Sequence, residues 1–403
     1  MSETTSSETE DALRAAMRLQ EAGDYAGAIA AYRRMAEQAL TVNIACNLGV
    51  CLSESGQFEE AEHWLMLAAR HRPDLAELRR LLANLYTETD RLELAELEYR
   101  TALAFQPDNG SAKLGLGGLL LTVGRYAEGW PLLEARVGLN PEVVPPVKVS
   151  FPEWTGEPLA GKSVLVWYEQ GLGDQIQFAR FAQSLKARGA AHVALGCRPP
   201  LVSLLEMAAG VDEVIPVPRG GSISVKRYDF WTRYFSLPGR LGVTLQTLPT
   251  GPYISAPPDR RGKWPGFEGK VGFVWRSSPT GFNARNKNIP DDLAQRILDL
   301  GAVSLHPEDT GVADFADTAA IMEQLDLVIS IDTSVAHLAG AMGKPCWTLI
   351  PRLHCDWRWM RDRADSPWYP TMRLYRQARP NEWGPVVERV ERDLAARLRK
   401  AAP

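Results

Sequence analysis

The stretch G-Q-F-E-E-A-E-H-W-L-M-L-A-A-R-H-R-P at residues 56–73 is one copy of a pattern that recurs along the first third of the chain. The residue that opens the pattern returns with spacings of 33, 34 and 34, and the proline that closes it returns every 34 residues. An aromatic or aliphatic residue stands two places after each opening residue, and a small residue stands three places further on. The four opening residues are Gly23, Gly56, Asp90 and Gly124; the prolines are Pro73, Pro107 and Pro141; the small residues are Ala28, Ala61, Ala95 and Gly129.

A period of 34 residues with this pattern is typical of tetratricopeptide repeats, which form two antiparallel helices each. The small residue lets the two helices approach closely, and the proline ends the second helix because it cannot continue the hydrogen-bond ladder. We predict about four repeats over residues 12–141, the first lacking much of its leading helix.

Stacked repeats form an α-solenoid whose concave groove is lined by the first helix of each repeat. Helical spacing selects the groove positions, and we predict a groove for a protein acceptor from the polar ones. They are Asn43, Asn47, Arg80 and Asn84, with Cys46, Val50, Ser53, Glu77 and Thr87 beside them. Leucines surround the first helix of the fourth repeat, residues 114–121, so we expect that repeat to be buried against the rest of the chain.

Length and composition limit the remaining choices. The chain has 403 residues, which predicts two or three domains. A net charge of −4 gives no argument for a nucleic-acid partner or an anionic membrane surface, and no apolar run reaches membrane-spanning length. Residues 1–11 are rich in Ser, Thr and Glu and predict a disordered tail rather than a secretion signal. Five cysteines without a C-x-x-C pair favour a reducing, cytoplasmic location.

The second half of the chain alternates short apolar runs with helical patterns. Residues 142–160 are proline-rich and read as a linker. Strands are predicted at 163–168, 192–196, 211–217, 271–275, 302–305, 327–331 and 346–350. Helices are predicted at 175–188, 201–209, 291–300, 318–325 and 334–342. This alternation predicts two parallel α/β sheets, over 161–258 and 268–400, which would enclose a ligand cleft.

The first candidate motif is Y-E-Q-G-L-G-D-Q at residues 168–175, between a predicted strand and a helix. Gly171 and Gly173 allow a tight turn, and the free N–H groups at the start of the helix attract anions. Ile176 occupies the last position of G-x-G-x-x-G, which disfavours a dinucleotide site. Asp174 is either the cap of the helix or a carboxylate that acts as a general base.

The second candidate is the run L-V-I-S-I-D-T-S-V-A-H at 327–337. A buried strand leads into Asp332, Thr333 and Ser334 at a helix N-terminus, which suits a diphosphate, and His337 lies one turn further on. The alternative is a capped helix with a core histidine.

Two other segments have weaker signals. Ser277 ends a strand, and Arg285 and Lys287 follow in a polar loop where cations could neutralise phosphate, although such a loop can also be simply solvated. The aromatic and arginine-rich segment 356–370 reads as a packing brace. No D-x-D motif occurs and no zinc-ligand spacing is complete, so we predict no metal.

Several of these stretches together resemble the bacterial glycosyltransferases related to the ADP-heptose:lipopolysaccharide heptosyltransferases, in the branch fused to tetratricopeptide repeats. The matching stretches are G-L-G-D-Q-I-Q-F-A-R at 171–180, D-F-A-D-T-A-A at 314–320, L-D-L-V-I-S-I-D-T-S-V-A-H-L-A-G-A-M-G-K-P at 325–345 and S-P-W-Y-P-T-M-R-L at 366–374. The resemblance implies a GT-B fold of two facing Rossmann-like domains, a nucleotide-sugar donor held mainly by the second, and inverting chemistry without a metal or other cofactor.

The resemblance also assigns roles. Asp174 corresponds to the proposed base that deprotonates the acceptor hydroxyl, and Lys287 to a lysine that contacts donor phosphate. The turn with Asp332, Thr333, Ser334 and His337 corresponds to the one that holds the diphosphate, and Gly171, Gly173, Gln175 and Ser277 complete the predicted donor site. The chain departs from the family in Ser304-Leu305-His306, where relatives often have S-L-Q, and in its short loop at 307–313.

The protein O-GlcNAc transferases share the repeat-plus-transferase architecture, but of their groove asparagines only Asn47 has a counterpart here. Leu81 and Gly115 occupy that position in the next two repeats.

The sequence therefore predicts a glycosyltransferase that acts on a protein, such as a flagellin-like one, recruited by the repeat groove. Two alternatives remain open. One is assembly of lipopolysaccharide or polysaccharide, and the other is an adaptor whose transferase half is inactive.

Overall fold

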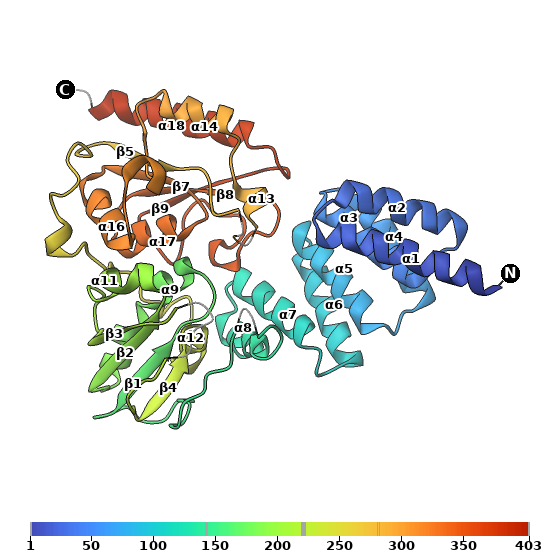
Figure 1. Ribbon diagram of the computed structural model, residues 1–403, viewed down its shortest axis with the longest axis horizontal. Coiled ribbons are helices and arrows are strands. Elements are labelled where there is room, and N and C mark those ends of the chain that lie inside the picture. The colour runs from blue at the N-terminus through green and yellow to red at the C-terminus, as the bar shows by residue number, and fades with distance from the viewer. Residues whose placement is uncertain (1, 142–143, 219–222, 280, 282, 402–403) are drawn as a thin grey trace. The chain divides into compact units, whose positions relative to one another are not determined.

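The computed structural model describes residues 2–141, 144–218, 223–279, 281 and 283–401. The chain forms two compact units, residues 1–120 and 121–403. The first is helical, and the second contains two parallel sheets with helices around them (Figure 1). The predicted fold class, a tetratricopeptide α-solenoid followed by two parallel α/β sheets, is confirmed.

Helical hairpins make up the first unit. The helices are α1 (Ser2–Glu21), α2 (Tyr25–Gln38), α3 (Val42–Glu54), α4 (Phe58–His71), α5 (Ala76–Glu88), α6 (Leu92–Phe105) and α7 (Gly110–Thr122), with the unit boundary inside α7. The repeated turn residue has a positive φ in every copy, from 59° at Asp90 to 81° at Gly124. That conformation favours glycine, which explains why three of the four copies are glycine. The small residues Ala28, Ala61 and Ala95 are fully buried where the paired helices touch.

The N-terminal segment differs from its prediction. Helix α1 begins at Ser2, whereas the sequence predicts a disordered tail over residues 1–11 and an incomplete leading helix in repeat one. Glutamate recurs in this part of the sequence and is a good helix former.

The first sheet has the strand order β3-β2-β1-β4, and all its strands are parallel. The strands are β1 (Ser163–Trp167), β2 (His192–Cys197), β3 (Glu213–Pro216) and β4 (Phe230–Arg233), and the sequence analysis missed β4. Its helices are α9 (Leu172–Phe178), α10 (Phe181–Ala187), α11 (Val202–Leu205) and α12 (Leu237–Arg240). Residues 175–188, predicted as one helix, are divided between α9 and α10.

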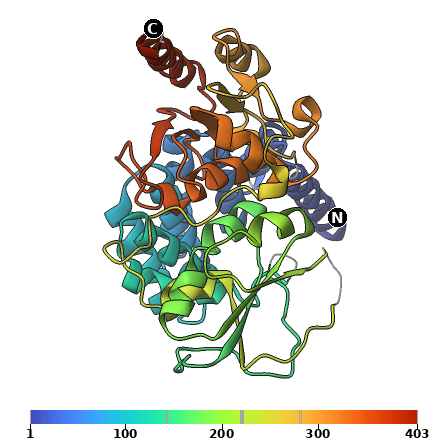
Figure 2. The ribbon, with the colours of Figure 1, turned by 90° about the vertical axis from the view of Figure 1, so that its left-hand side faces the viewer.

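The second sheet has the order β6-β5-β7-β8-β9, again parallel throughout. Its strands are β5 (Val271–Val274), β6 (Val303–Ser304), β7 (Leu327–Ile331), β8 (Cys346–Ile350) and β9 (Met372–Arg376), the last of which was not predicted. Its helices are α13 (Ala284–Lys287), α14 (Asp291–Leu298), α15 (Pro307–Thr310), α16 (Phe315–Gln324), α17 (Ser334–Ala341) and α18 (Gly384–Ala401). Helices α9 and α11 of the first sheet lie against α17 and α16 of the second (Figures 1 and 2).

The predicted linker is packed rather than free. Residues 142 and 143 lie outside the described residues, but Phe151, Trp154 and Leu159 are buried against the first sheet. The Trp231 amide donates to the Pro152 carbonyl at 3.0 Å, and the Trp154 amide donates to the Trp231 carbonyl at 2.7 Å. These apolar side chains and the exposed edge of β4 draw the segment onto the sheet despite its prolines.

Helix α8 (Tyr126–Leu133), the second helix of repeat four, belongs to the second unit. Its Trp130 is 3% exposed and donates through Nε1 to the Val243 carbonyl at 2.9 Å. The Trp368 Nε1 donates to the Tyr126 hydroxyl at 2.9 Å, and the rings of Trp130 and Trp357 meet edge to face at 5.4 Å. The segment predicted as a packing brace therefore packs on α8. The leucines Leu116, Leu119, Leu120 and Leu121 of the first helix of repeat four are buried, as predicted. The contacts described here come from the second helix of that repeat, which the prediction did not name.

Removing one ring from this aromatic cluster tests how much the cluster contributes to the stability of the second unit. We expect Trp130→Ala to lower the free energy of unfolding of the second unit by roughly 3–5 kcal/mol, because a large buried side chain and its packing are lost. Leu97→Ala is the control: Leu97 is 58% exposed, so a change within about 0.5 kcal/mol is expected. Urea unfolding followed by circular dichroism measures both. A loss below about 1 kcal/mol for Trp130→Ala would show that the cluster does not hold α8.

Candidate functional site

The candidate site lies where the carboxyl ends of β1 and β7 lead into α9 and α17. Gly171 is the N-cap of α9, and its amide donates to Asp174 Oδ2 at 2.8 Å. Asp174 is therefore not the N-cap that one of the two interpretations predicted: it is the third residue of α9, and its carboxylate accepts from the amide of the N-cap. Its other carboxylate oxygen, Oδ1, accepts from the Arg358 side chain.

A close contact joins the two loops. A Cβ atom on Gly173 would lie 2.7 Å from Cδ2 of His337 and 3.3 Å from Cα of Ser334. Only glycine leaves room for this approach, because real Cβ atoms do not come so near to other heavy atoms. The structure thus places Asp174 beside the N-terminal turn of α17, although about 160 residues separate the two segments in sequence.

Arg358, which the sequence analysis did not select, lies at the centre of the site. Its side chain is 4% exposed, and its Nη2 donates to Asp174 Oδ1 at 2.5 Å while Nη1 donates to Asp356 Oδ2 at 2.6 Å. Its Nε donates to the Gln177 side chain. The only sequence signal was the density of arginines and tryptophans at 356–370, and a density of that kind does not tell one arginine from another.

Burial and charge act against each other at Asp174. Burial raises the pKa of Asp174 above its ordinary value, and Asp356 adds to that rise, while the Arg358 guanidinium and the Gly171 amide lower it. The ionised form of this partly buried carboxylate therefore depends on one arginine.

Asp332 and His337 form the opposite wall. The His337 Nδ1 lies 3.0 Å from the Tyr369 hydroxyl, and its ring stacks on Trp359. Burial and nearby cations, Arg358 first among them, hold the pKa of His337 well below its usual range, so the imidazole is neutral at pH 7. The His337 Nε2 lies 4.0 Å from Asp332 Oδ1. Burial, with Asp356 as the next cause, raises the pKa of Asp332 to about 6.

The polar loop after β5 borders this wall. The positive charge of Lys287 acts on both Asp332 and His337, which places Lys287 near the turn. Ser277 donates through its amide and its hydroxyl to Asn288 Oδ1, each at 2.9 Å. Asn283 donates to the Leu353 carbonyl at 2.9 Å and ties the loop to the segment after β8.

The structure brings most of the predicted donor-site residues together. Facing loops carry Gly171, Gly173, Asp174, Asp332, Thr333, Ser334 and His337, and Ser277 and Lys287 lie on the adjoining loop. Gln175 is different: it is fully buried, and its amide accepts from the Arg198 amide at 2.9 Å and donates to the Gly171 carbonyl at 3.2 Å. Because backbone groups occupy both ends of its side chain, Gln175 supports the loop instead of reaching a ligand.

The predicted groove residues belong to the first unit. Asn43 and Asn84 are exposed, and Asn47 and Arg80 are half-buried, on the first helices of repeats two and three. Arg80 Nε donates to Glu77 Oε2 at 2.9 Å, and the Asn84 amide hydrogen-bonds the Tyr99 hydroxyl at 2.6 Å. Asn43 and Asn84 are thus accessible to a partner, and Arg80 and Asn84 already hydrogen-bond neighbouring side chains.

Within the described ranges, no three His, Cys, Asp or Glu side chains converge as a metal site requires. The five cysteines form no disulfide. Among the helices that the structure describes, none combines the length and the apolar character needed to cross a membrane.

Comparison with known proteins adds three findings. The family model of the tetratricopeptide repeat matches residues 19–85. Protein FlbA of Caulobacter vibrioides is 25% identical to this chain over an alignment of 405 residues, gaps included. The alignment covers 88% of this chain. The chain spans only 66% of that relative's length. The protein therefore carries tetratricopeptide repeats near its N-terminus and is distantly related to FlbA.

Solved structures align with about a third of the chain. They include a MamA crystal structure (TM-score 0.28, 20% identity, 32% of this chain and 76% of that one). Another is MamA 41-end from Desulfovibrio magneticus RS-1 (TM-score 0.28, 18% identity, 32% of this chain and 72% of that one). A third is a tetratricopeptide repeat protein from Parabacteroides merdae (TM-score 0.29, 20% identity, 33% of this chain and 53% of that one).

The raised pKa of Asp332 predicts a pH-dependent stability. The folded state binds the Asp332 proton more tightly than the unfolded chain, so the contribution of this group to stability falls as pH rises from about 4 to about 6. We expect Asp332→Asn to raise the free energy of unfolding at about pH 7.5 by roughly 1–3 kcal/mol and to change little near pH 4.

Urea unfolding at the two pH values measures the difference, with the exposed Asp292→Asn as the control. A variant less stable than the wild type at the higher pH would mean that Lys287 and Arg358 stabilise the carboxylate by more than burial penalises it.

Proposed function

We propose that the protein is a glycosyltransferase that moves a sugar from a nucleotide-sugar donor to an acceptor, and that the acceptor is a protein held by the repeat groove. The observation that carries the proposal is the contact of the Asp174 loop with the N-terminus of α17. It sets a half-buried carboxylate opposite a turn that would suit a diphosphate. Two parallel sheets whose carboxyl ends face one site are compatible with the GT-B arrangement that the sequence motifs imply.

In the proposed reaction the acceptor hydroxyl attacks the anomeric carbon of the donor sugar. Its proton passes to Asp174, a bond forms between the acceptor oxygen and the anomeric carbon, and the bond from that carbon to the nucleoside diphosphate breaks. The departing diphosphate receives Lys287 and the N–H groups of the Thr333–Ser334 turn, which stabilise the charge that develops. Arg358 keeps the base ionised, and neutral His337 fixes the turn through Tyr369.

The acceptor assignment rests on the groove. The tetratricopeptide match over residues 19–85 supports a protein partner, since solenoid grooves are protein-binding surfaces. A flagellin-like acceptor remains the proposal that the family resemblance favours.

A second candidate is an adaptor with an inactive transferase half. The observation that favours it is the ion pair between Asp174 and Arg358, because a base already neutralised by a guanidinium must be released before it can accept a proton. Release of free sugar from a nucleotide-sugar donor by the isolated protein would exclude the adaptor.

The base assignment predicts a large kinetic effect. Asp174→Asn retains an oxygen for the Gly171 amide but accepts no proton at neutral pH, so transfer should fall by roughly 10²–10⁴ while the protein stays folded. The matched control is Asp356→Asn, which removes the other carboxylate on Arg358. If Asp356→Asn lowers transfer equally, the two carboxylates only balance the charge of Arg358, and Asp174 is not the base.

The donor assignment predicts a binding effect. Lys287→Ala should weaken binding of nucleoside diphosphates by roughly 1.5–3 kcal/mol, the range for a hydrogen bond to a charged group. Isothermal titration calorimetry with a panel of nucleoside diphosphates measures it, and Arg285→Ala, two residues away, is the control. Equal affinity in wild type and Lys287→Ala would remove Lys287 from the site.

The groove assignment predicts separable activities. Replacing Asn47, Arg80 and Asn84 together by alanine should sharply reduce glycosylation of a protein acceptor and leave slow donor hydrolysis unchanged, because these residues lie outside the second unit. Arg100→Ala on α6 is the control. Unchanged protein glycosylation in the triple variant would favour the lipopolysaccharide or polysaccharide alternative.

A further inference from the structure

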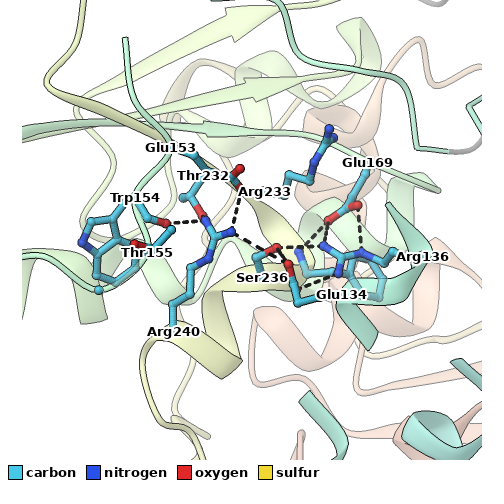
Figure 3. Close-up of polar contacts among 12 residues, drawn as sticks. Glu134, Arg136, Glu153, Trp154, Thr155, Glu169, Thr232, Arg233, Ser236 and Arg240 are labelled. Atoms are coloured by element: carbon cyan, nitrogen blue, oxygen red, sulfur yellow. Dashed lines mark hydrogen bonds and ion pairs between the residues drawn. The ribbon is translucent and has the colours of Figure 1, made fainter. Parts of the chain in front are cut away.

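Glu169 is a fully buried carboxylate at the carboxyl end of the strand that leads to the candidate base. It stands two residues after β1 and five before Asp174, and its exposed fraction is 0%. Its Oε1 accepts from the Phe235 amide at 2.9 Å. The other donors to this carboxylate come from a single side chain, Arg136 (Figure 3).

Arg136 reaches Glu169 from the turn that follows α8, the second helix of repeat four. Its Nε donates to Glu169 Oε2 at 3.0 Å and its Nη2 donates to Oε1 at 2.8 Å, a two-pronged pairing. Its remaining N–H groups donate to the Leu133 carbonyl, to Glu134 Oε1 and to the Ser236 hydroxyl. All five donors of this guanidinium are therefore used, and its side chain is 4% exposed.

A buried pair of this kind has a strong local effect when it is broken, because the partner that remains is a charge without compensation. Glu169 would then have the Phe235 amide as its one remaining donor among those described above. The residue after Glu169, Gln170, has a φ of +63°, a left-handed conformation that a non-glycine residue keeps only where its surroundings fix it. Gly171, whose amide donates to Asp174 Oδ2, comes next.

We propose that Arg136 is a positioning residue: through Glu169, the last helix of the repeat region fixes the loop that holds Asp174. The proposal rests on the proposed function in taking Asp174 as the base. A residue that only stabilised the fold would affect the whole second unit. A positioning role predicts instead an effect confined to the loop and α9, and that effect should persist when Glu169 is also replaced by an uncharged residue.

Three variants separate these effects. Arg136→Met removes the guanidinium but keeps an unbranched side chain. The double variant Arg136→Met/Glu169→Gln also removes the buried charge and retains an oxygen for the Phe235 amide, so its melting temperature should return toward that of the wild type. Arg240→Met is the matched control, because Arg240 lies in the same network but donates to the Trp154 carbonyl, Thr232 and Glu153 (Figure 3).

The decisive readout is hydrogen exchange, measured by mass spectrometry on peptides that cover residues 168–178. We expect exchange there to be faster by about tenfold or more in both Arg136→Met and the double variant, which corresponds to about 1.4 kcal/mol of local opening free energy. Arg240→Met should match the wild type in these peptides. Wild-type exchange over 168–178 in the double variant would overturn the proposal.

Transfer kinetics supply the second readout. The kcat of the double variant should fall by roughly 10², the effect of a catalytic group displaced by about 1 Å, while its affinity for nucleoside diphosphates stays unchanged. A wild-type kcat despite faster exchange would also overturn the proposal. If the wild-type protein transfers no sugar, the proposed function fails, and the exchange measurement still decides whether Arg136 fixes the loop.

Discussion

The guanidinium of Arg358 is buried to 4% exposure, and a charge in that position requires carboxylates around it. Asp174 lies on α9, beside the first sheet, and Asp356 lies in the segment after β8 of the second sheet. The Gln177 side chain on α9 accepts from the remaining nitrogen, Nε. One side chain thus fixes the end of α9 against the segment before β9. The close approach of Gly173 to His337 and Ser334 lies in the same region, between α9 and the first turn of α17.

The same arginine explains the electrostatics of the site. Asp174, Asp332 and Asp356 all interact with it, and burial raises the pKa of both Asp174 and Asp332. Three carboxylates outnumber one guanidinium and Lys287, so these groups give the site no excess positive charge. In the proposed function, the N–H groups of the α17 turn must therefore contribute to anion binding along with Lys287.

Helix α8 and the residues up to Arg136 show that a sequence repeat and a compact unit need not end at the same place. Tyr126 and Trp130 pack with Trp357 and Trp368, and Arg136 pairs with Glu169. These contacts give the second unit a helix that the sequence assigns to the fourth repeat. Apolar packing and a buried ion pair place α8 in the second unit. Neither kind of contact produces a repeating pattern in the sequence, so the 34-residue period does not reveal them.

The sequence by itself determined the elements whose pattern is local. The 34-residue period predicted the helical hairpins, and alternating apolar runs predicted β1, β2, β5, β7 and β8 within one or two residues. It also selected Gly173, Asp174, Asp332 and His337, because a strand followed by a glycine-rich or Asp-Thr-Ser turn is a local pattern. Only the tertiary structure decided the rest. Strand β4 has only four residues and includes the charged Arg233. Gln175 becomes a buried support, and Arg358 and Arg136 gain their roles from partners that lie 184 and 33 residues away in sequence. A buried charge is defined by what surrounds it, and a linear sequence does not give that environment until the chain has folded.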